Sequence, residues 1–272
     1  MYQLHLAVLL AALSLMNLQN VATAQSQISF KNDVMPLFLR GGCNSGSCHG
    51  AARGKDGFKL SLFGYDPDGD YYRLLEEYVG RRVNLAAPEK SLILEKVSGA
   101  VPHTGGKIFP SNSKYYETLR SWIAAGSPLD SNDAPEPVRL ELEPEKVVFS
   151  RPGETRQAQV IAHYSDGTKR DVSDLSLYMT NNEAVATIDK QATIVGHKGG
   201  GTHVFARFNK FTVGTEVVVL PEGNFDWPDT PEHNFVDPLV FAKLKELRIV
   251  PSDISTDEQF LRRVTIDLTG KL

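Results

Sequence analysis

The sequence predicts a multidomain protein with a small all-α domain first, an all-β sandwich second and a short helical segment at the end. Three patterns predict this order. Apolar residues recur at helical spacing within 30–39 and 113–126, alternate at strand spacing within 158–164 and 213–219, and return to helical spacing after residue 255. A chain of 272 residues is long enough for two domains and part of a third.

The first 24 residues predict a secretory signal peptide. An apolar stretch in 4–16 is too short to span a bilayer, and Ala22-Thr23-Ala24 has the small-x-small form of a cleavage site. No later segment is apolar enough to cross a membrane. We therefore expect an exported protein, periplasmic or in the cell envelope, with no transmembrane segment after signal removal.

The chain has two cysteines, Cys43 and Cys48, and the second is followed at once by His49. Covalent haem attachment needs this combination, because the two sulfurs form thioethers with the porphyrin vinyl groups and the adjacent imidazole ligates iron. The standard motif is C-x-x-C-H, whereas four residues separate these cysteines. The motif predicts one covalent haem c, attached through Cys43 and Cys48, with His49 as the proximal iron ligand.

Two other uses of the cysteines stay open. In an exported chain Cys43 and Cys48 could form a disulfide across the flexible residues 44–47. Alternatively, both cysteines, His49 and one distant histidine could hold a structural Zn²⁺.

His103 is the leading candidate for the distal iron ligand. It lies in 101–107, a loop punctuated by proline and glycine that can bring a side chain to a haem edge, and no methionine follows the cysteine motif in the first domain. Two imidazoles give a lower reduction potential than histidine with methionine. This ligand pair favours an electron carrier over an open, ligand-binding haem.

Three further segments complete the first domain. Residues 30–39 predict a helix ended by two glycines, 58–62 alternate like a short strand, and 113–126 predict a helix that Ser111 or Ser113 can cap. Residues 66–77 carry acidic side chains at calcium-loop spacing, but their glycine falls at the fourth position instead of the sixth. We expect a turn there, with Asp70 capping the next helix.

From about residue 30 to 128 the chain resembles the planctomycete-type cytochrome c domain. The resemblance rests on the cysteine-histidine motif, on 88–94 and on 119–128. The commoner family pattern has C-x-x-C-H and a distal Met-Pro-Pro, whereas this chain is similar to a subgroup that pairs the longer spacing with the His-Thr-Gly-Gly of 103–106. The resemblance implies a cytochrome c-like all-α haem domain over 25–127 and electron transfer with redox partner proteins.

A polar, proline-rich linker over 128–137 precedes the all-β part, 138–221, in which Ser165-Asp-Gly-Thr168 reads as a hairpin turn. Residues 164–173, 182–189 and 199–206 carry a resemblance to the bacterial immunoglobulin-like group 2 domain. That resemblance implies an immunoglobulin-like sandwich that spaces or presents other domains, with cell-surface or carbohydrate contact as a possible role.

A second linker over 222–234 leads to 235–272, where Ser255-Thr-Asp-Glu258 has the form of a capping box. This end resembles the opening of a domain of unknown function found beside planctomycete-type cytochromes. Two short helices bury little apolar surface alone, so we expect the natural protein to continue.

Net charge −4 with scattered Lys and Arg excludes a nucleic-acid partner. No catalytic constellation is present, which favours an electron-transfer protein over a catalyst. The predicted function is that of an exported c-type cytochrome with an immunoglobulin-like spacer. The alternative is a non-redox cell-surface protein, adhesive or carbohydrate-contacting, with a Cys43–Cys48 disulfide.

Overall fold

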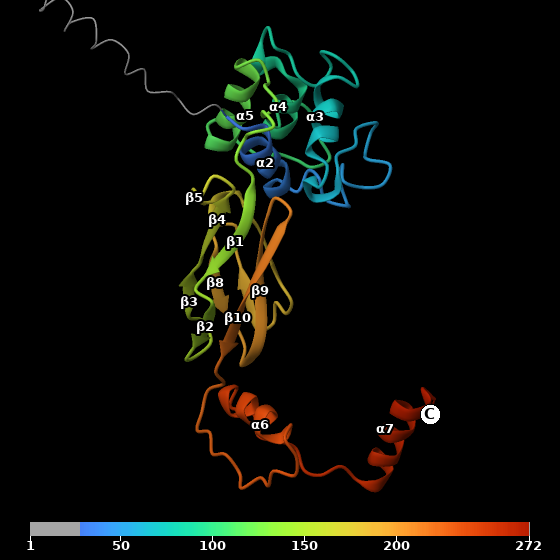
Figure 1. Cartoon of the computed structure of the whole chain (residues 1–272), viewed down its shortest axis with the longest axis vertical. Coiled ribbons are helices and arrows are strands. Elements are labelled where there is room, and N and C mark those ends of the chain that lie inside the picture. The colour runs from blue at the N-terminus through green and yellow to red at the C-terminus, as the bar shows by residue number, and fades with distance from the viewer. Residues whose placement is uncertain (1–27, 272) are drawn as a thin grey trace, which may run out of the picture. The chain divides into compact units, whose positions relative to one another are not determined.

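The computed structural model describes residues 28–271, and the chain divides between Ala134 and Pro135 into two compact units (Figure 1). The signal peptide predicted over 1–24 lies outside the described residues. The first unit consists of short helices joined by long turns. These helices are η1 (Phe30–Val34), α2 (Met35–Arg40), η2 (Leu62–Gly64), α3 (Pro67–Leu75), η3 (Pro88–Lys90), α4 (Leu92–Ser98) and α5 (Lys114–Ala124).

An aromatic pair forms the centre of the first unit. Phe30 of η1 and Trp122 of α5 are fully buried, and their rings stack with centroids 5.3 Å apart. Tyr71 of α3 meets Phe30 edge-on and donates its hydroxyl to the carbonyl of Ser127. The helices predicted over 30–39 and 113–126 are confirmed, and Ser113 caps α5 by accepting a hydrogen bond from an amide in the first turn.

The strand predicted over 58–62 is wrong. This part of the described chain forms one isolated bridge, Lys55 with Phe58, and then the turn η2. Gly57 has a φ of 74° and Phe63 a φ of 56°, which lie in the left-handed region and end any extended run. The apolar alternation of this segment instead places Leu60 in the core.

The predicted fold class is also wrong. The described chain is mainly β-sheet with a few helices, and its first unit is not a small all-α cytochrome c-like domain. Turns and loops occupy 41–54, 76–87 and 99–113, and glycines end two of the helices, α2 at Gly41 and α4 at Gly99. Helical periodicity identified the helices at both ends of the unit but could not reveal how much irregular chain lies between them.

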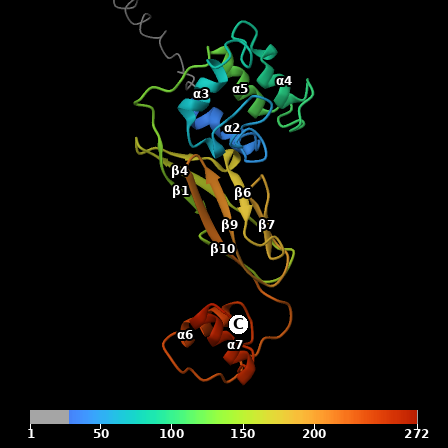
Figure 2. The same cartoon turned by 90° about the vertical axis from the view of Figure 1, so that its right-hand side faces the viewer.

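The second unit contains three sheets, with strand orders β1-β4-β5, β2-β10-β9-β6 and β3-β8-β7. Figure 2 shows β6, β9 and β10 side by side. Buried apolar residues from all three sheets form one core cluster. The strands are β1 (Pro137–Glu143), β2 (Lys146–Phe149), β3 (Thr155–Gln157), β4 (Gln159–Tyr164), β5 (Lys169–Asp171), β6 (Leu177–Thr180), β7 (Ala186–Ile188), β8 (Thr193–Gly196), β9 (Gly200–Phe208) and β10 (Phe211–Val219).

The alternation in 158–164 and the predicted turn after it are confirmed. Val160, Ala162 and Tyr164 of β4 are buried, as the strand period requires. β4 pairs antiparallel with β5, and the amide of Gly167 closes the turn by donating to the carbonyl of Tyr164. A β-branched and apolar strand with one buried face therefore forms where the sequence predicted it.

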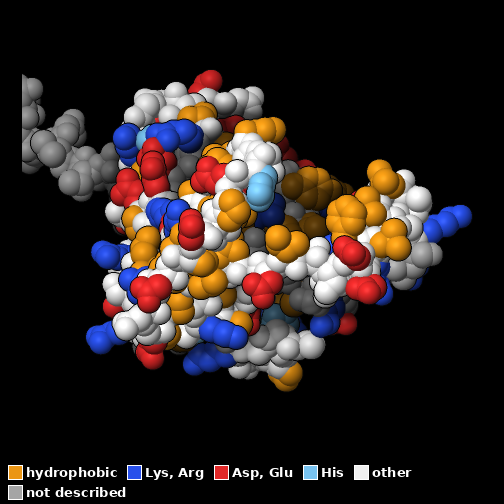
Figure 3. Space-filling view, turned by 90° about the horizontal axis from the view of Figure 1, so that it is seen from below, with side chains coloured by type: hydrophobic (Ala, Val, Ile, Leu, Met, Phe, Trp, Pro, Cys, Tyr) orange, Lys and Arg blue, Asp and Glu red, His pale blue; other side chains and the backbone are white. Residues whose placement is uncertain are grey.

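Helices α6 (Asp237–Glu246) and α7 (Asp257–Thr269) follow the sheets. Thr256 caps α7 by accepting a hydrogen bond from the amide of Gln259, one residue after Ser255, where the predicted capping box placed the cap. Apolar side chains remain exposed on both helices, and Figure 3 shows apolar and charged side chains interspersed on the face seen from below. Within residues 28–271, every helix is too short or too polar to serve as a membrane span.

Candidate functional site

A cavity of about 370 Å³ in the first unit brings together three of the four residues that the sequence singled out, Cys43, His49 and His103. Its volume lies within the range of small-molecule and cofactor sites. Its wall is mainly apolar, as a hydrophobic ligand requires. The apolar lining residues are Phe38, Phe58, Leu60, Leu74, Leu92, Ile93 and Val97.

The end of α2 places Cys43 at this cavity. The chain turns at Gly41 and Gly42, the latter with a φ of 69°, and the amide of Cys43 donates to the carbonyl of Phe38 at 2.8 Å. A Cβ on Gly41 would lie 2.9 Å from Ile108 Cγ2 and 3.1 Å from Cys43 Sγ. A glycine is needed there because the first cysteine packs against the end of the helix.

The loop between the cysteines is closed by backbone hydrogen bonds. The amide of His49 donates to the carbonyl of Cys43 at 2.9 Å, and the amide of Cys48 donates to the carbonyl of Ser45 at 3.0 Å. Gly46 and Ser47 are exposed. The residues that lengthen the motif therefore project into solvent, while the first cysteine and the histidine stay close together.

His49 is held in one orientation. Its Nδ1 lies 2.9 Å from the carbonyl oxygen of Phe58, and the amide of Leu60 donates to the carbonyl of His49. The Nδ1–H donates to that carbonyl, which leaves Nε2 as the ring's acceptor, as in metal-ligating histidines. Burial lowers the pKa of His49, although the bond to Phe58 opposes the shift. The ring is therefore kept in the neutral form that ligates metal.

His103 lies in a loop tied to α4. Lys96 Nζ donates to the carbonyl of Pro102 at 2.7 Å, and the amide of Gly106 donates to the carbonyl of His103. A Cβ on Gly105 would lie 2.9 Å from Cε1 of His103, so a glycine leaves room for the ring. His103 Nδ1 is buried without a hydrogen-bond partner among the described residues. A buried polar atom of this kind is costly, and a bound ligand would satisfy the ring.

The two histidine rings lie parallel. Their planes differ by 5° and their centroids are 6.2 Å apart. An imidazole nitrogen lies about 2 Å from a first-row metal that it ligates, so two imidazoles on opposite sides of one metal have centroids roughly 6 Å apart. The centroid separation of His49 and His103 is therefore of the size that two imidazoles holding one metal ion would have.

Both cysteines are free thiols in the structure. Burial raises the pKa of Cys43 to about 12, and the neighbouring Cys48 adds to the rise. The free Cys43 thiol is therefore uncharged, in keeping with the mainly apolar wall of the cavity that it lines. Within residues 28–271, no cluster of three or more His, Cys, Asp or Glu side chains has the arrangement of a metal site.

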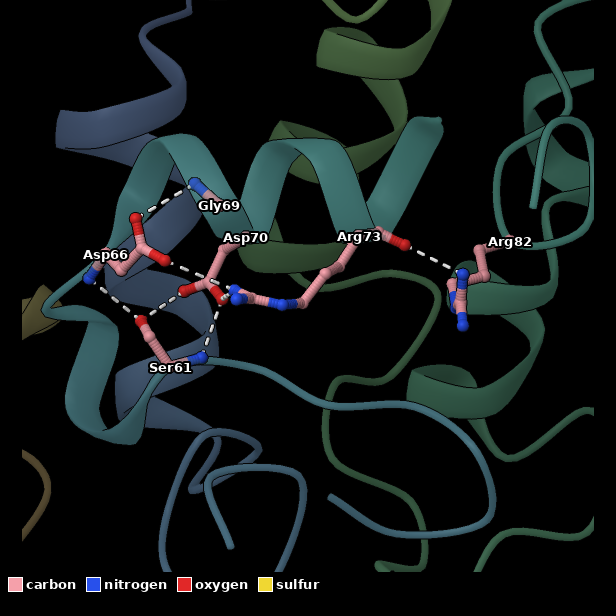
Figure 4. Close-up of polar contacts among 6 residues, drawn as sticks. All are labelled: Ser61, Asp66, Gly69, Asp70, Arg73 and Arg82. Atoms are coloured by element: carbon pink, nitrogen blue, oxygen red, sulfur yellow. Dashed lines mark hydrogen bonds and ion pairs between the residues drawn. The ribbon is translucent and has the colours of Figure 1, made fainter. Parts of the chain in front are cut away.

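In the acidic segment 66–77, which has calcium-loop spacing, Asp66 and Asp70 bind other groups of the protein (Figure 4). Asp66, not Asp70, caps α3 by accepting from the amide of Gly69. Asp70 is buried inside α3, where it accepts from the amide of Ser61 at 2.6 Å and pairs with Arg73 at 3.1 Å. These carboxylates have protein partners, and the predicted capping role of Asp70 is corrected.

Sequence reasoning missed the role of Phe58. Its carbonyl orients His49, and its ring lies under the guanidinium of Arg82 with 4.5 Å between the two groups. Arg82 is buried and also donates to the carbonyl of Arg73 and pairs with Glu77. No periodic pattern signals this arrangement, because Phe58, His49 and Arg82 all lie in irregular segments outside the helices and strands.

No family model and no curated protein matches this chain. Among solved structures, domains 5-6 of the S-layer protein SbsC match at 15% identity over 34% of this chain and 48% of that chain, with a TM-score of 0.28. Domains 1-6 of the surface layer protein SbsC match at 16% identity over 36% of this chain and 14% of that chain, with a TM-score of 0.30. These neighbours are S-layer domains rather than cytochrome c domains, and at these TM-scores the likeness carries no argument about function.

Proposed function

We propose that this chain is an exported haem protein that transfers electrons. Cys43 and Cys48 would attach one haem c, with His49 as the proximal iron ligand and His103 as the distal one. The observation that carries the proposal is the parallel pair of histidine rings, 6.2 Å apart, in an apolar cavity that Cys43 also lines.

Each residue has a defined task in this proposal. The carbonyl of Phe58 orients His49 through Nδ1 and raises the basicity of the ring. The apolar wall would exclude water, and His49 and His103 would both hold the iron, which favours electron transfer over binding of an external ligand. Bound haem supplies the one-electron redox chemistry.

The resemblance of 30–128 to planctomycete-type cytochromes supports the same function, although the fold class that it implied is corrected above. The signal sequence supports a periplasmic or cell-envelope location. The second unit would act as a spacer or an interaction module, by its resemblance to the immunoglobulin-like group 2 domain.

The test is to express the full chain in a host that carries a cytochrome maturation system and to stain a denaturing gel for haem. We expect a stained band at the chain's mass that is lost when Cys43→Ala and Cys48→Ala are combined. A control protein with the same cysteine spacing must stain in the same host. An unstained band beside a stained control, with Cys43 and Cys48 resistant to alkylation until reduced, would overturn the proposal in favour of the disulfide-bonded surface protein.

A further inference from the structure

The cavity has a cationic rim that the proposed ligation does not use. Four cationic side chains line it, together with the carboxylate of Asp56. Two of the four are engaged elsewhere: Arg82 bonds to the carbonyl of Arg73, and Lys96 bonds to the carbonyl of Pro102. The other two, Lys55 and Arg81, remain to be explained.

Neither Lys55 nor Arg81 has a side-chain partner among the described residues. Their backbone amides are bonded, that of Lys55 to the carbonyl of Phe58 and that of Arg81 to the carbonyl of Tyr78, so both segments are fixed. Lys55 is half-buried. Arg81 is exposed. A cation at the margin of a mainly apolar cavity, with no partner in the protein, is available to pair with an anionic group of a ligand.

Both cations are anchored beside the residue that orients His49. Lys55 forms a two-bond bridge with Phe58, and Arg82, the neighbour of Arg81, covers the ring of Phe58 and donates to the carbonyl of Gly57 at 3.3 Å. The rim therefore lies close to the proposed iron ligand, while most of the remaining lining is apolar. A flat apolar ligand in this cavity would therefore meet two cations at one margin.

We propose that Lys55 and Arg81 bind the two carboxylate groups of the porphyrin. Haem has an apolar face and edge and carries its two negative charges on one side, which matches a cavity with an apolar wall and two unpaired cations. An arginine beside a carboxylate can form a bidentate pair, and a lysine supplies a compact charge. This assignment rests on the proposed function. It adds the two side chains that would set the orientation of the haem in the cavity.

The test uses the full mature chain with Cys43→Ala and Cys48→Ala, so that the ligand binds reversibly. This protein is titrated with haemin and with haemin dimethyl ester, which lacks the two carboxylates, and binding is followed by visible absorbance. Lys55→Gln with Arg81→Gln is then added to the same background. The matched control is Lys59→Gln with Arg53→Gln, two exposed cations outside the cavity.

We expect the Lys55 and Arg81 variant to lose affinity for haemin on the order of tenfold, since two partly exposed ion pairs are removed, with no change for the diester. The control variant should bind both ligands as the parent does. An unchanged haemin affinity, or an equal loss for haemin and its diester, would overturn this assignment while leaving the proposed function standing.

A second measurement covers the case in which the cysteine-free protein fails to fold. In the covalently loaded chain, removal of two cations near the iron should lower the reduction potential in the Lys55 and Arg81 variant but not in the control. An identical potential in both would overturn the assignment. If the wild-type chain carries no covalent haem and the cysteine-free chain binds neither ligand, the proposed function itself fails.

Discussion

The backbone amide of His49 donates a hydrogen bond to the carbonyl of Cys43 over 2.9 Å, although five residues separate them. This bond holds the backbone of the first cysteine beside that of the histidine across the loop. Gly46 and Ser47 project into solvent, so the longer cysteine spacing is compatible with the same local geometry. In the proposed haem site, the residues that lengthen the motif would therefore lie on its outside.

This closed loop depends on Gly50. A Cβ there would lie 2.1 Å from the carbonyl oxygen of Asn44, which is backbone and cannot move away easily. We expect Gly50→Ala to destabilise the first unit by about 2 kcal/mol or more and to reduce haem incorporation. Gly46→Ala is the control, because its Cβ would meet its nearest atom at 3.9 Å. Urea unfolding and haem staining measure both effects, and equal behaviour of the two variants would contradict the importance of the closed loop.

Replacement of His103 tests the distal ligand. We expect His103→Ala to keep the haem covalently attached, because the cysteines are unchanged, but to convert the visible spectrum from low-spin to high-spin as the second imidazole is lost. His203→Ala, in the second unit, should leave the spectrum as it is in the wild type. A low-spin spectrum that survives His103→Ala would remove this residue from the site.

The glycine next to this ligand provides a graded version of the same test. A Cβ at Gly105 would lie 2.9 Å from Cε1 and 3.3 Å from Nδ1 of His103, so the ring must shift. We expect Gly105→Ala to give a mixture of low-spin and high-spin haem. Thr104→Ala, at an exposed position of the same loop, should not change the spectrum. If both variants give the wild-type spectrum, the ring does not need the space that Gly105 leaves.

The sequence was informative about this site where chemistry depends on residue type and local spacing. Cys43, His49 and His103 were identified from their types and loop context, and the structure brings all three to one cavity. Ser111 and Ser113 were both candidate caps, because capping depends on residues within one helical turn, and the structure has Ser113 as the cap.

What could not be predicted depends on contacts that residue type and periodicity do not encode, such as the bonds of Arg82 and Lys96 to backbone carbonyls nine and six positions away. The sequence does not distinguish the four cations of the cavity rim. Only the structure shows that Arg82 and Lys96 have partners and that, among the described residues, Lys55 and Arg81 do not. The fold class was wrong for a similar reason. Periodicity detects regular elements, whereas the turns between them are fixed by packing and by single glycines with positive φ.

Asp70 provides a test of the buried polar network in Figure 4. Its carboxylate is fully buried and accepts from Ser61 while it pairs with Arg73. We expect Asp70→Ala to destabilise the chain by about 3 kcal/mol, because it leaves the amide and hydroxyl of Ser61 without their buried acceptor and leaves Arg73 with only its longer pair to Asp66. Asp68→Ala removes only a surface pair with Lys31 and should cost less than about 1 kcal/mol. Urea unfolding distinguishes them, and similar losses would show that the network contributes no more than a surface pair.

The contact between α6 and the sheets should weaken in acid. Glu216 of β10 accepts hydrogen bonds from Lys243 of α6 and Lys146 of β2, and the bond from Lys243 is the main cause that lowers its pKa. An unfolded glutamate titrates near about 4.3. Because the folded pKa lies below that value, the ion pairs stabilise the folded state above it, and this contribution is lost as the pH falls through the folded pKa.

Amide hydrogen exchange of α6, corrected for the intrinsic effect of pH on exchange, measures this loss. We expect protection of α6 to fall below about pH 4 in the wild type, and Glu216→Gln to be less protected at neutral pH with a flatter pH dependence. Glu222→Gln changes an exposed glutamate just after β10 and should behave like the wild type. Since α6 also contacts Gly201 of β9 through Leu247, some protection should persist in acid. A pH dependence that is the same in Glu216→Gln and in the wild type would assign the acid response to other groups.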